Sequence, residues 1–252
     1  MFLFPLSLQA QQPFTIDDAD VTEHQKFQLQ ISHEFDILAR SAHPSLRQNT
    51  TVFVLNYGLM RDVEIGVDYP LIVISNAEGT TPQTIKGFGD LNFHVKYNFL
   101  KEREGKRRPA LTISFAMEVP TGDTAKGLGS GLLDYSVNGV LQKSLTTKTT
   151  LRANGGIVFA GNTSTGFAGI RTRGRVFTAG ASLVRQFTPK LNLGIELTGA
   201  ASNNLNLGAG QLQTQFGGNY QLTKKMSLDF GVLAGRSNNP RAGAQIGVSI
   251  DF

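Results

Sequence analysis

The sequence predicts an all-β fold, an antiparallel transmembrane β-barrel of about twelve strands. Apolar and polar residues alternate in repeated segments of roughly ten residues, which places each kind of residue on its own face of a sheet. The connections between these segments tend to alternate between short and long, and no apolar run is long enough to form a spanning helix. A tilted strand of roughly 9–11 residues crosses a bilayer, so the length of the segments fits a membrane barrel.

The clearest unit is Gly89–Val119, in which two alternating segments flank a charged turn. In the first segment, Leu91, Phe93, Val95, Tyr97 and Phe99 alternate with Asp90, Asn92, His94, Lys96 and Asn98. In the second, Leu111, Ile113, Phe115, Met117 and Val119 alternate with Thr112, Ser114, Ala116 and Glu118. This pattern is typical of two neighbouring antiparallel strands.

The chain repeats this unit about six times. The predicted strands lie at about Glu23–Asp36, Gln48–Tyr57, Val63–Leu71, Leu91–Phe99, Leu111–Val119, Leu133–Leu141, Leu151–Phe159, Phe177–Leu183, Leu191–Thr198, Gln211–Leu222, Met226–Val232 and Ala244–Phe252. Val52 and Val54 blur the alternation of the second strand, and Pro70 should loosen pairing in the third because it lacks a ladder donor. Longer connections are expected at Asn76–Phe88, Pro120–Gly131, Gly161–Gly174, Ser202–Gly210 and Arg236–Arg241. The glycines of Gly127–Gly131 predict a flexible loop.

The asymmetry of the connections favours an outer-membrane barrel over a soluble sheet. Such barrels have an even number of strands, short periplasmic turns and longer outer loops. Soluble sandwiches and propellers also alternate, but their strands are usually about five or six residues long. The chain also ends on an aromatic residue, Phe252, in phase with the apolar face. Because the chain contains no Trp, Tyr and Phe must build the interfacial girdles.

The N-terminus resembles the end of a signal peptide. Met1–Ala10 is mostly apolar and ends on a small residue, although it lacks a basic start; a short strand or a disordered tail is the alternative. We therefore expect a residual signal peptide over 1–10, a periplasmic segment over 11–22 and the barrel over 23–252. The location that follows is the outer membrane of a Gram-negative bacterium.

Composition excludes several kinds of site. The chain has no cysteine, which removes disulfides and zinc–thiolate sites, and we expect neither a metal nor a cofactor. Its net charge of +5 is modest, and many of its basic residues fall in turns and loops, so no nucleic-acid partner is expected.

If the apolar face meets lipid, the polar face lines the lumen. Strand parity then places inside the barrel Glu34, Glu64, Asp68, Asp90, His94, Lys96, Glu118, Asp134, Arg152, Glu196, Asp229 and Asp251. The lumen should be acidic, which favours cations in pores. Alternatively, these charges pair with one another and only fill and stabilise the barrel. Twelve strands lie between a filled eight-stranded barrel and a sixteen-stranded porin, so a narrow or partly plugged passage is expected.

Two other functions remain open. The first is an enzyme acting on lipid, in which His94 would reach Ser114 across the strand pair, with Asp90 or Asp134 nearby. The second is a structural or adhesive barrel. The outer loops carry Lys86, Arg171, Arg173, Arg236 and Arg241, which could bind the phosphates of lipopolysaccharide or be solvated.

Four stretches resemble a known family: Gly87–Tyr97, Val119–Asp123, Gly127–Gly131 and Asp134–Val137. They are similar to the outer-membrane "MetA-pathway of phenol degradation" transporter family. The resemblance implies a transporter-like barrel for small or aromatic compounds, and it transfers no catalytic or binding residue. Together with the strand pattern, it predicts a channel for passive uptake of small solutes, aromatic or hydrophobic ones among them, through a polar lumen.

Overall fold

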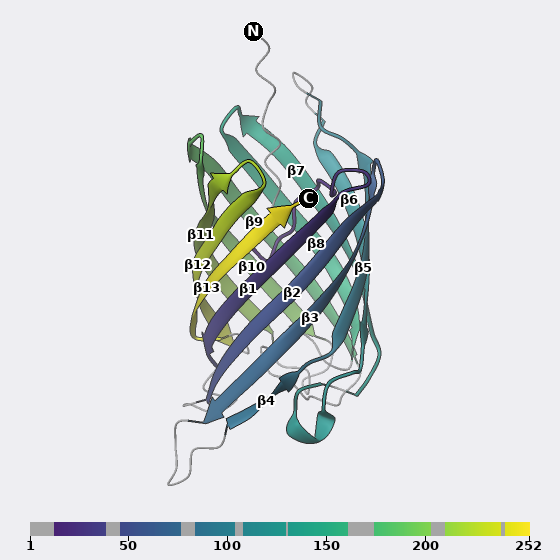
Figure 1. Cartoon of the computed structure of the whole chain (residues 1–252), viewed down its shortest axis with the longest axis vertical. Coiled ribbons are helices and arrows are strands. Elements are labelled where there is room, and N and C mark those ends of the chain that lie inside the picture. Colours follow the sequence, from purple (N-terminus) through teal and green to yellow (C-terminus); the bar gives the residue numbers. More distant parts are fainter. Residues whose placement is uncertain are drawn as a thin grey trace.

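In the computed structural model the chain forms one closed antiparallel β-barrel (Figure 1). The structure describes residues 13–38, 46–76, 84–103, 108–129, 131–160, 174–202, 210–237 and 240–252. Its strands are β1 (Phe27–Ile37), β2 (Leu46–Met60), β3 (Val63–Asn76), β4 (Thr84–Phe88), β5 (Leu91–Leu100), β6 (Ala110–Val119), β7 (Asp134–Thr146), β8 (Thr149–Ala160), β9 (Gly174–Thr188), β10 (Leu191–Ser202), β11 (Gln211–Thr223), β12 (Met226–Ser237) and β13 (Ala242–Asp251). Among the residues so described, no helix is long and apolar enough to cross a membrane.

The sheet closes because its first and last strands pair with each other. β1 pairs with both β2 and β13, and β3 pairs with β2, β4 and β5. β4 and β5 pair with successive parts of the same edge of β3, so together they occupy one strand position. The thirteen strands therefore form a twelve-stranded barrel. The prediction of a twelve-stranded antiparallel barrel is therefore confirmed.

The loop predicted at Asn76–Phe88 is partly wrong, because its last five residues form β4. The remainder of that loop, 77–83, lies outside the described residues. The first strand also begins later than predicted, at Phe27 instead of Glu23. Phe88 is outward and 46% exposed, and its ring stacks on Tyr69 with centroids 4.5 Å apart, which explains why this short segment joins the sheet.

Pairing is interrupted beside Pro70, as its missing N–H predicts. β5 pairs with β3 as far as Asp68, and β4 resumes the pairing at Leu71. In this gap, residues 69 and 70 of β3 lie opposite residues 89–91 of the neighbouring chain segment. Two residues facing three make a β-bulge. Gly89 N donates a hydrogen bond to Pro70 O across the gap (2.8 Å). On the other side, Val52 still pairs with Pro70, so the loosening affects one edge only.

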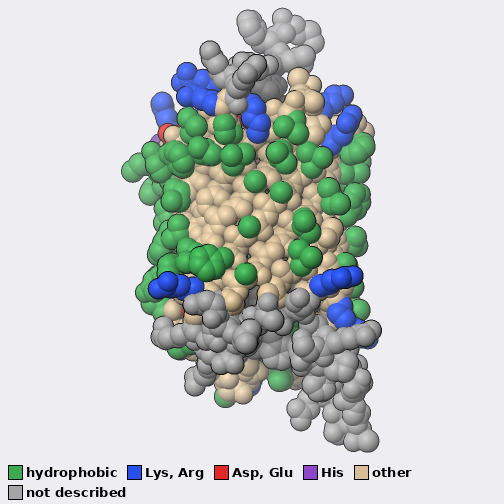
Figure 2. All heavy atoms as spheres, turned by 180° about the vertical axis from the view of Figure 1, so that it is seen from behind, with side chains coloured by type: hydrophobic (Ala, Val, Ile, Leu, Met, Phe, Trp, Pro, Cys, Tyr) green, Lys and Arg blue, Asp and Glu red, His purple; other side chains and the backbone are tan. Residues whose placement is uncertain are grey.

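Exposure of the side chains separates a membrane barrel from a soluble sheet. On β5, Phe93 and Val95 are 43% and 44% exposed, whereas Lys96 is 4% exposed. The same inversion holds on other strands, where large apolar side chains such as Phe177 and Ile246 are more than half exposed and polar side chains such as Ser182 and Asp229 are buried. Figure 2 shows one face of the outer surface, where hydrophobic side chains gather toward both ends of the barrel. A continuous apolar band would be unfavourable in water, whereas it is the surface that outer-membrane barrels present to lipid. The predicted strand parity is therefore confirmed.

Aromatic rings collect where the strands meet the short turns. Phe27 packs against Tyr57 with ring centroids 4.6 Å apart and against Phe252 at 5.8 Å. The guanidinium of Arg185 lies 5.9 Å from the ring centre of Phe187. Phenyl and phenol rings thus occupy the interfacial position that Trp often takes in other membrane proteins.

Candidate functional site

The predicted lumen residues lie inside the barrel wall. Seven of them are at most 6% exposed: Glu64, Asp90, Lys96, Asp134, Arg152, Glu196 and Asp229. Asp68 and His94 line a cavity, and Glu118 is half-buried beside its register partner Asp134. The described part of the wall contributes ten inward carboxylates, namely Glu34, Asp36, Glu64, Asp68, Asp90, Glu118, Asp134, Glu196, Asp229 and Asp251. Among the described strands, Lys96 and Arg152 are the inward lysine and arginine, and His94 is an inward imidazole, so carboxylates outnumber basic groups and the lumen is strongly acidic.

The N-terminal segment, residues 13–22, runs inside the barrel. The sequence placed 11–22 in the periplasm; residues 11 and 12 lie outside the described part of the chain, and 13–22 contact the lumen wall. Glu196 accepts hydrogen bonds from Thr15 N (2.9 Å) and Ile16 N (2.8 Å), and Gln215 Nε2 donates to Pro13 O. A strand carboxylate therefore binds the backbone of this segment directly.

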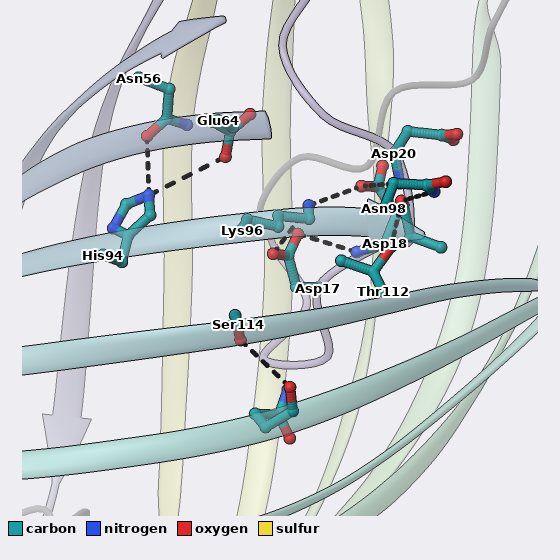
Figure 3. A network of polar contacts seen from close by, with 12 residues as sticks. Asp17, Asp18, Asp20, Asn56, Glu64, His94, Lys96, Asn98, Thr112 and Ser114 are labelled. Carbon is teal, nitrogen blue, oxygen red and sulfur yellow. Dashed lines mark hydrogen bonds and ion pairs between the residues drawn. The ribbon is translucent and has the colours of Figure 1, made fainter. Parts of the chain in front are cut away.

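An ion-pair cluster around Lys96 holds the middle of the segment (Figure 3). Lys96 Nζ lies 2.9 Å from Asp17 Oδ2 and 3.1 Å from Asp18 Oδ1. Asp18 is 3% exposed, so its carboxylate depends on Lys96 as a nearby countercharge. Asn98 and Thr112 both donate to Ala19 O, the latter at 2.5 Å.

The end of the segment is bound in the same way. Thr22 donates through its backbone N and its hydroxyl to Glu64 Oε2, both at 2.6 Å. Gln142 Nε2 donates to Asp20 Oδ2 at 3.1 Å, and its amide oxygen accepts from Arg152 Nε at 3.0 Å. Several of the predicted lumen charges thus bind the chain's own N-terminal segment.

Glycines allow the segment to lie against the wall. The atoms nearest to a Cβ on Gly231 would be Pro13 Cβ and Cγ and the side-chain amide nitrogen of Gln215, at 3.0–3.4 Å. A Cβ on Gly180 would meet Ile16 Cδ1 at 2.9 Å. The absence of a side chain at these two positions creates room for the segment.

Gly231→Val is expected to displace the segment without breaking the barrel, because the added methyl groups overpack against Pro13. Overpacking costs typically about 1–3 kcal/mol. The measurement is the rate at which a thiol reagent modifies Ala19→Cys, whose site is 0% exposed; the rate should rise several-fold in Gly231→Val. The matched control is Gly155→Val, since a Cβ at Gly155 meets nothing within 4 Å. Equal rates in both variants would show that the segment does not pack against Gly231.

A cavity of about 310 Å³ remains beside the segment. It lies near the lower end of the roughly 300–1,000 Å³ range of small-ligand pockets. His94 crosses one wall, with Nδ1 3.3 Å from Asp68 Oδ1 and Nε2 3.1 Å from Asn56 Oδ1. Gln28, Gln30 and Ser114 add polar groups, while Phe14, Val54 and Ala116 add apolar ones. The arrangement suits a small solute that makes both polar and apolar contacts.

The loop predicted to be flexible at Gly127–Gly131 is instead packed where it is described. A 3-10 turn, Thr124–Lys126, ends at Gly127 with φ 72°, and Leu128 then turns inward and is 2% exposed. Leu128 packs with Leu38, Ile72, Ile74 and Ile85 at the long-loop end of the barrel, and we call these five residues the mouth cluster. Asp90 anchors the start of the loop by accepting from Gly122 N at 2.8 Å. Ser130 lies outside the described residues.

Leu128→Ala is expected to free this loop, because truncating a buried leucine costs about 2–5 kcal/mol. The readout is limited trypsin cleavage after Lys126, which should be faster than in the parent protein. Leu145→Ala is the matched control, because it removes the same atoms from a side chain that is 54% exposed on the outer face. Unchanged cleavage in Leu128→Ala would mean that the mouth cluster does not hold the loop.

The contacts do not assemble the serine–histidine pair of the enzyme hypothesis. Within the described residues, Ser114 Oγ donates weakly to Asn138 O (3.5 Å), while His94 contacts Asn56, Asp68 and Glu64. The register pairs His94 with Ala116 and Ser114 with Lys96. No hydrogen bond between Ser114 and His94 is found in this part of the chain, so the nucleophile and its base are not linked.

Sequence reasoning missed the N-terminal segment and the mouth cluster as parts of the site. The signal for the first was the run Asp17, Asp18 and Asp20 in a polar segment, together with a lysine predicted to face the lumen. The signal for the second was the apolar run Leu71–Ile74, which has large apolar residues on both faces of a strand. An apolar residue at an inward position predicts a partner inside the barrel.

Comparison with solved structures agrees with this architecture. The COG4313 outer membrane channel from Pseudomonas putida F1 matches with a TM-score of 0.65 and 16% identity, over 96% of this chain and 100% of that one. The NanC porin matches with a TM-score of 0.57 and 11% identity, over 89% and 98% of the two chains. The KdgM porin matches with a TM-score of 0.56 and 11% identity, over 89% and 99%. At these identities the likeness concerns the fold.

A search of curated proteins finds no match to the sequence. A family model does match, over residues 16–250, and its description is "Putative MetA-pathway of phenol degradation". The match spans nearly the whole chain, including most of the N-terminal segment, and it agrees with the resemblance that the sequence motifs carry. The chain therefore belongs to the family that carries this description.

Proposed function

We propose that this protein is a channel of the bacterial outer membrane that takes up small solutes by passive diffusion through its lumen. The observation that carries the proposal is a closed barrel with an apolar outer face and a polar, acidic interior that retains a cavity. An outward apolar belt requires lipid, and a charged lumen requires water. The solved structures of similar fold are named as an outer membrane channel and as porins, which supports the same interpretation.

The N-terminal segment sets the width of the passage in this proposal. It occupies lumen volume that would otherwise be water, and the remaining cavity of about 310 Å³ limits the solute to a small molecule. The carboxylates of Glu64 and Asp68 favour cations and hydrogen-bond donors there. Phe14 and Val54 line the same cavity, so a small aromatic compound with a hydroxyl group also matches its chemistry.

The outer surface adds a proposed partner. Lys86, Arg175 and Arg236 are exposed near the long-loop end, at the level where lipopolysaccharide phosphates lie. Arginine and lysine bind phosphate oxygens with charge-assisted hydrogen bonds. Arg171 and Arg173, which the sequence also assigned to this role, lie outside the described residues.

The test of the channel is conductance in planar bilayers together with swelling of liposomes. The full chain is expected to give small, stable ion currents and to admit small neutral and hydroxylated aromatic solutes. Protein unfolded before reconstitution is the control for leakage through defects. If the folded chain carries no current and liposomes exclude every small solute offered, the channel proposal fails.

A further inference from the structure

The short-turn end of the barrel is strongly basic. We define the short-turn rim as residues 23–26, 61–62, 101–103, 108, 143–148, 185–190 and 224–225. It contains eleven Lys and Arg against three Asp and Glu, a net charge of +8. The rest of the chain has 13 Lys and Arg against 16 Asp and Glu. The excess positive charge of the protein is therefore concentrated at one end.

The acids of the rim are already neutralised by rim lysines. Glu23 pairs with Lys26, Asp62 with Lys101 at 2.5 Å, and Glu102 with Lys143. Burial raises the pKa of the Glu102 carboxyl, but hydrogen bonds from Lys143 and Ser144 outweigh it and hold the pKa below its usual value. Within the described part of the chain, no ion pair is found for the other rim cations: Arg61, Arg103, Arg108, Lys148, Arg185, Lys190, Lys224 and Lys225.

These cations adjoin the apolar belt. Arg185 stands on the outward face of β9, two residues from the exposed ring of Phe187, and its guanidinium lies over that ring. The turn of Lys190 touches the next strands, because Gln221 N donates to Lys190 O at 2.8 Å. Lys224 and Lys225 form the adjacent turn. Basic side chains are visible at this end of the space-filling view, just beyond the apolar side chains (Figure 2).

We propose that the short-turn rim binds the headgroups of anionic phospholipids in the leaflet that surrounds it. Lipid chains must cover the apolar belt, so the headgroups of those same lipids lie level with the rim cations. A basic cluster beside a membrane surface attracts anionic lipid, and each cation adds to the attraction. The partner is therefore the lipid that already contacts the barrel, selected for a net negative headgroup.

The absence of Trp makes a site-specific test practical. Phe187→Trp introduces one fluorophore beside Arg185, at a ring that is 57% exposed. The full-length variant is reconstituted in phosphatidylcholine vesicles that contain brominated phosphatidylglycerol or, in a parallel sample, brominated phosphatidylcholine. The ratio of quenching by the two lipids measures the headgroup preference at the rim. Phe115→Trp, on the outer face within β6, is the matched probe away from the rim cations.

Brominated phosphatidylglycerol is expected to quench the fluorophore of Phe187→Trp several-fold more strongly than brominated phosphatidylcholine, with little preference in Phe115→Trp. The preference should disappear when Arg185→Gln, Lys190→Gln, Lys224→Gln and Lys225→Gln are combined. High salt should weaken it in the unaltered rim, which gives a test that needs no further substitution. Equal quenching by the two lipids beside the intact rim would overturn the proposal, whether or not the barrel conducts ions.

Discussion

Lys96→Met is expected to release the N-terminal segment from the lumen and to raise single-channel conductance several-fold. The substitution leaves Asp18, which is 3% exposed, without its nearest cation. Removing one partner of a buried ion pair costs about 3–5 kcal/mol. Because the segment is continuous with β1 through residues 23–26 and is no part of a strand, it can leave the lumen and return Asp18 to water while the strands stay paired. The measurement is the current through single proteins in a planar bilayer.

A second substitution tests whether the ion pair is the cause. Lys96→Met combined with Asp18→Asn removes both charges and keeps the shape of the second side chain, so the conductance should fall back toward that of the parent protein. Val95→Met is the matched control, because Val95 is outward and 44% exposed. An unchanged conductance in Lys96→Met would contradict a segment that narrows the passage and is held in place by this ion pair.

Charge reversal in the lumen is expected to have the second large effect, on ion selectivity. The parent channel should prefer cations, because in the described part of the wall ten carboxylates outnumber the inward Lys96, Arg152 and His94. Asp68→Lys combined with Glu118→Lys should lower the cation-to-anion permeability ratio several-fold, and Asp68→Asn with Glu118→Gln should give an intermediate ratio. The ratio is obtained from the reversal potential in a salt gradient.

The control for this series changes the same charge away from the lumen. Glu23→Lys alters an exposed carboxylate whose side chain is 68% exposed at the rim, so it should leave the permeability ratio nearly unchanged. If Glu23→Lys shifts the ratio as much as the lumen pair does, selectivity arises at the entrance. If none of the variants shifts it, the wall carboxylates do not line the ion path.

Much of the barrel could be predicted from alternation alone. Lys96 and its neighbour Val95 show why: a period of two fixes which face each residue takes, and lipid outside requires the apolar face to point outward. Closure followed from the even count of strands and the asymmetry of the connections. The inward position of Glu196 was predictable in the same way, although its role was not.

The contents of the lumen could not be predicted, because they depend on contacts distant in sequence. Glu196 accepts hydrogen bonds from the backbone N–H groups of Thr15 and Ile16. Because every residue except proline has a backbone N–H, the order of side chains does not indicate which N–H groups will bind a carboxylate. Leu128 is buried only because the wall brings the mouth cluster together from several elements. The strand β4 escaped prediction because it is five residues long and the bulge beside Pro70 reverses its parity relative to β5.

Accessibility of adjacent residues on one strand gives the most direct test that solutes pass through a lumen lined by the even residues of β5. The chain has no native cysteine, so His94→Cys and Val95→Cys each carry a single thiol. A small charged thiol reagent added during single-channel recording should lower the conductance of His94→Cys and leave that of Val95→Cys unchanged. A fall in conductance at position 95 with none at position 94 would place the conducting path on the opposite face of the sheet and contradict the proposed channel.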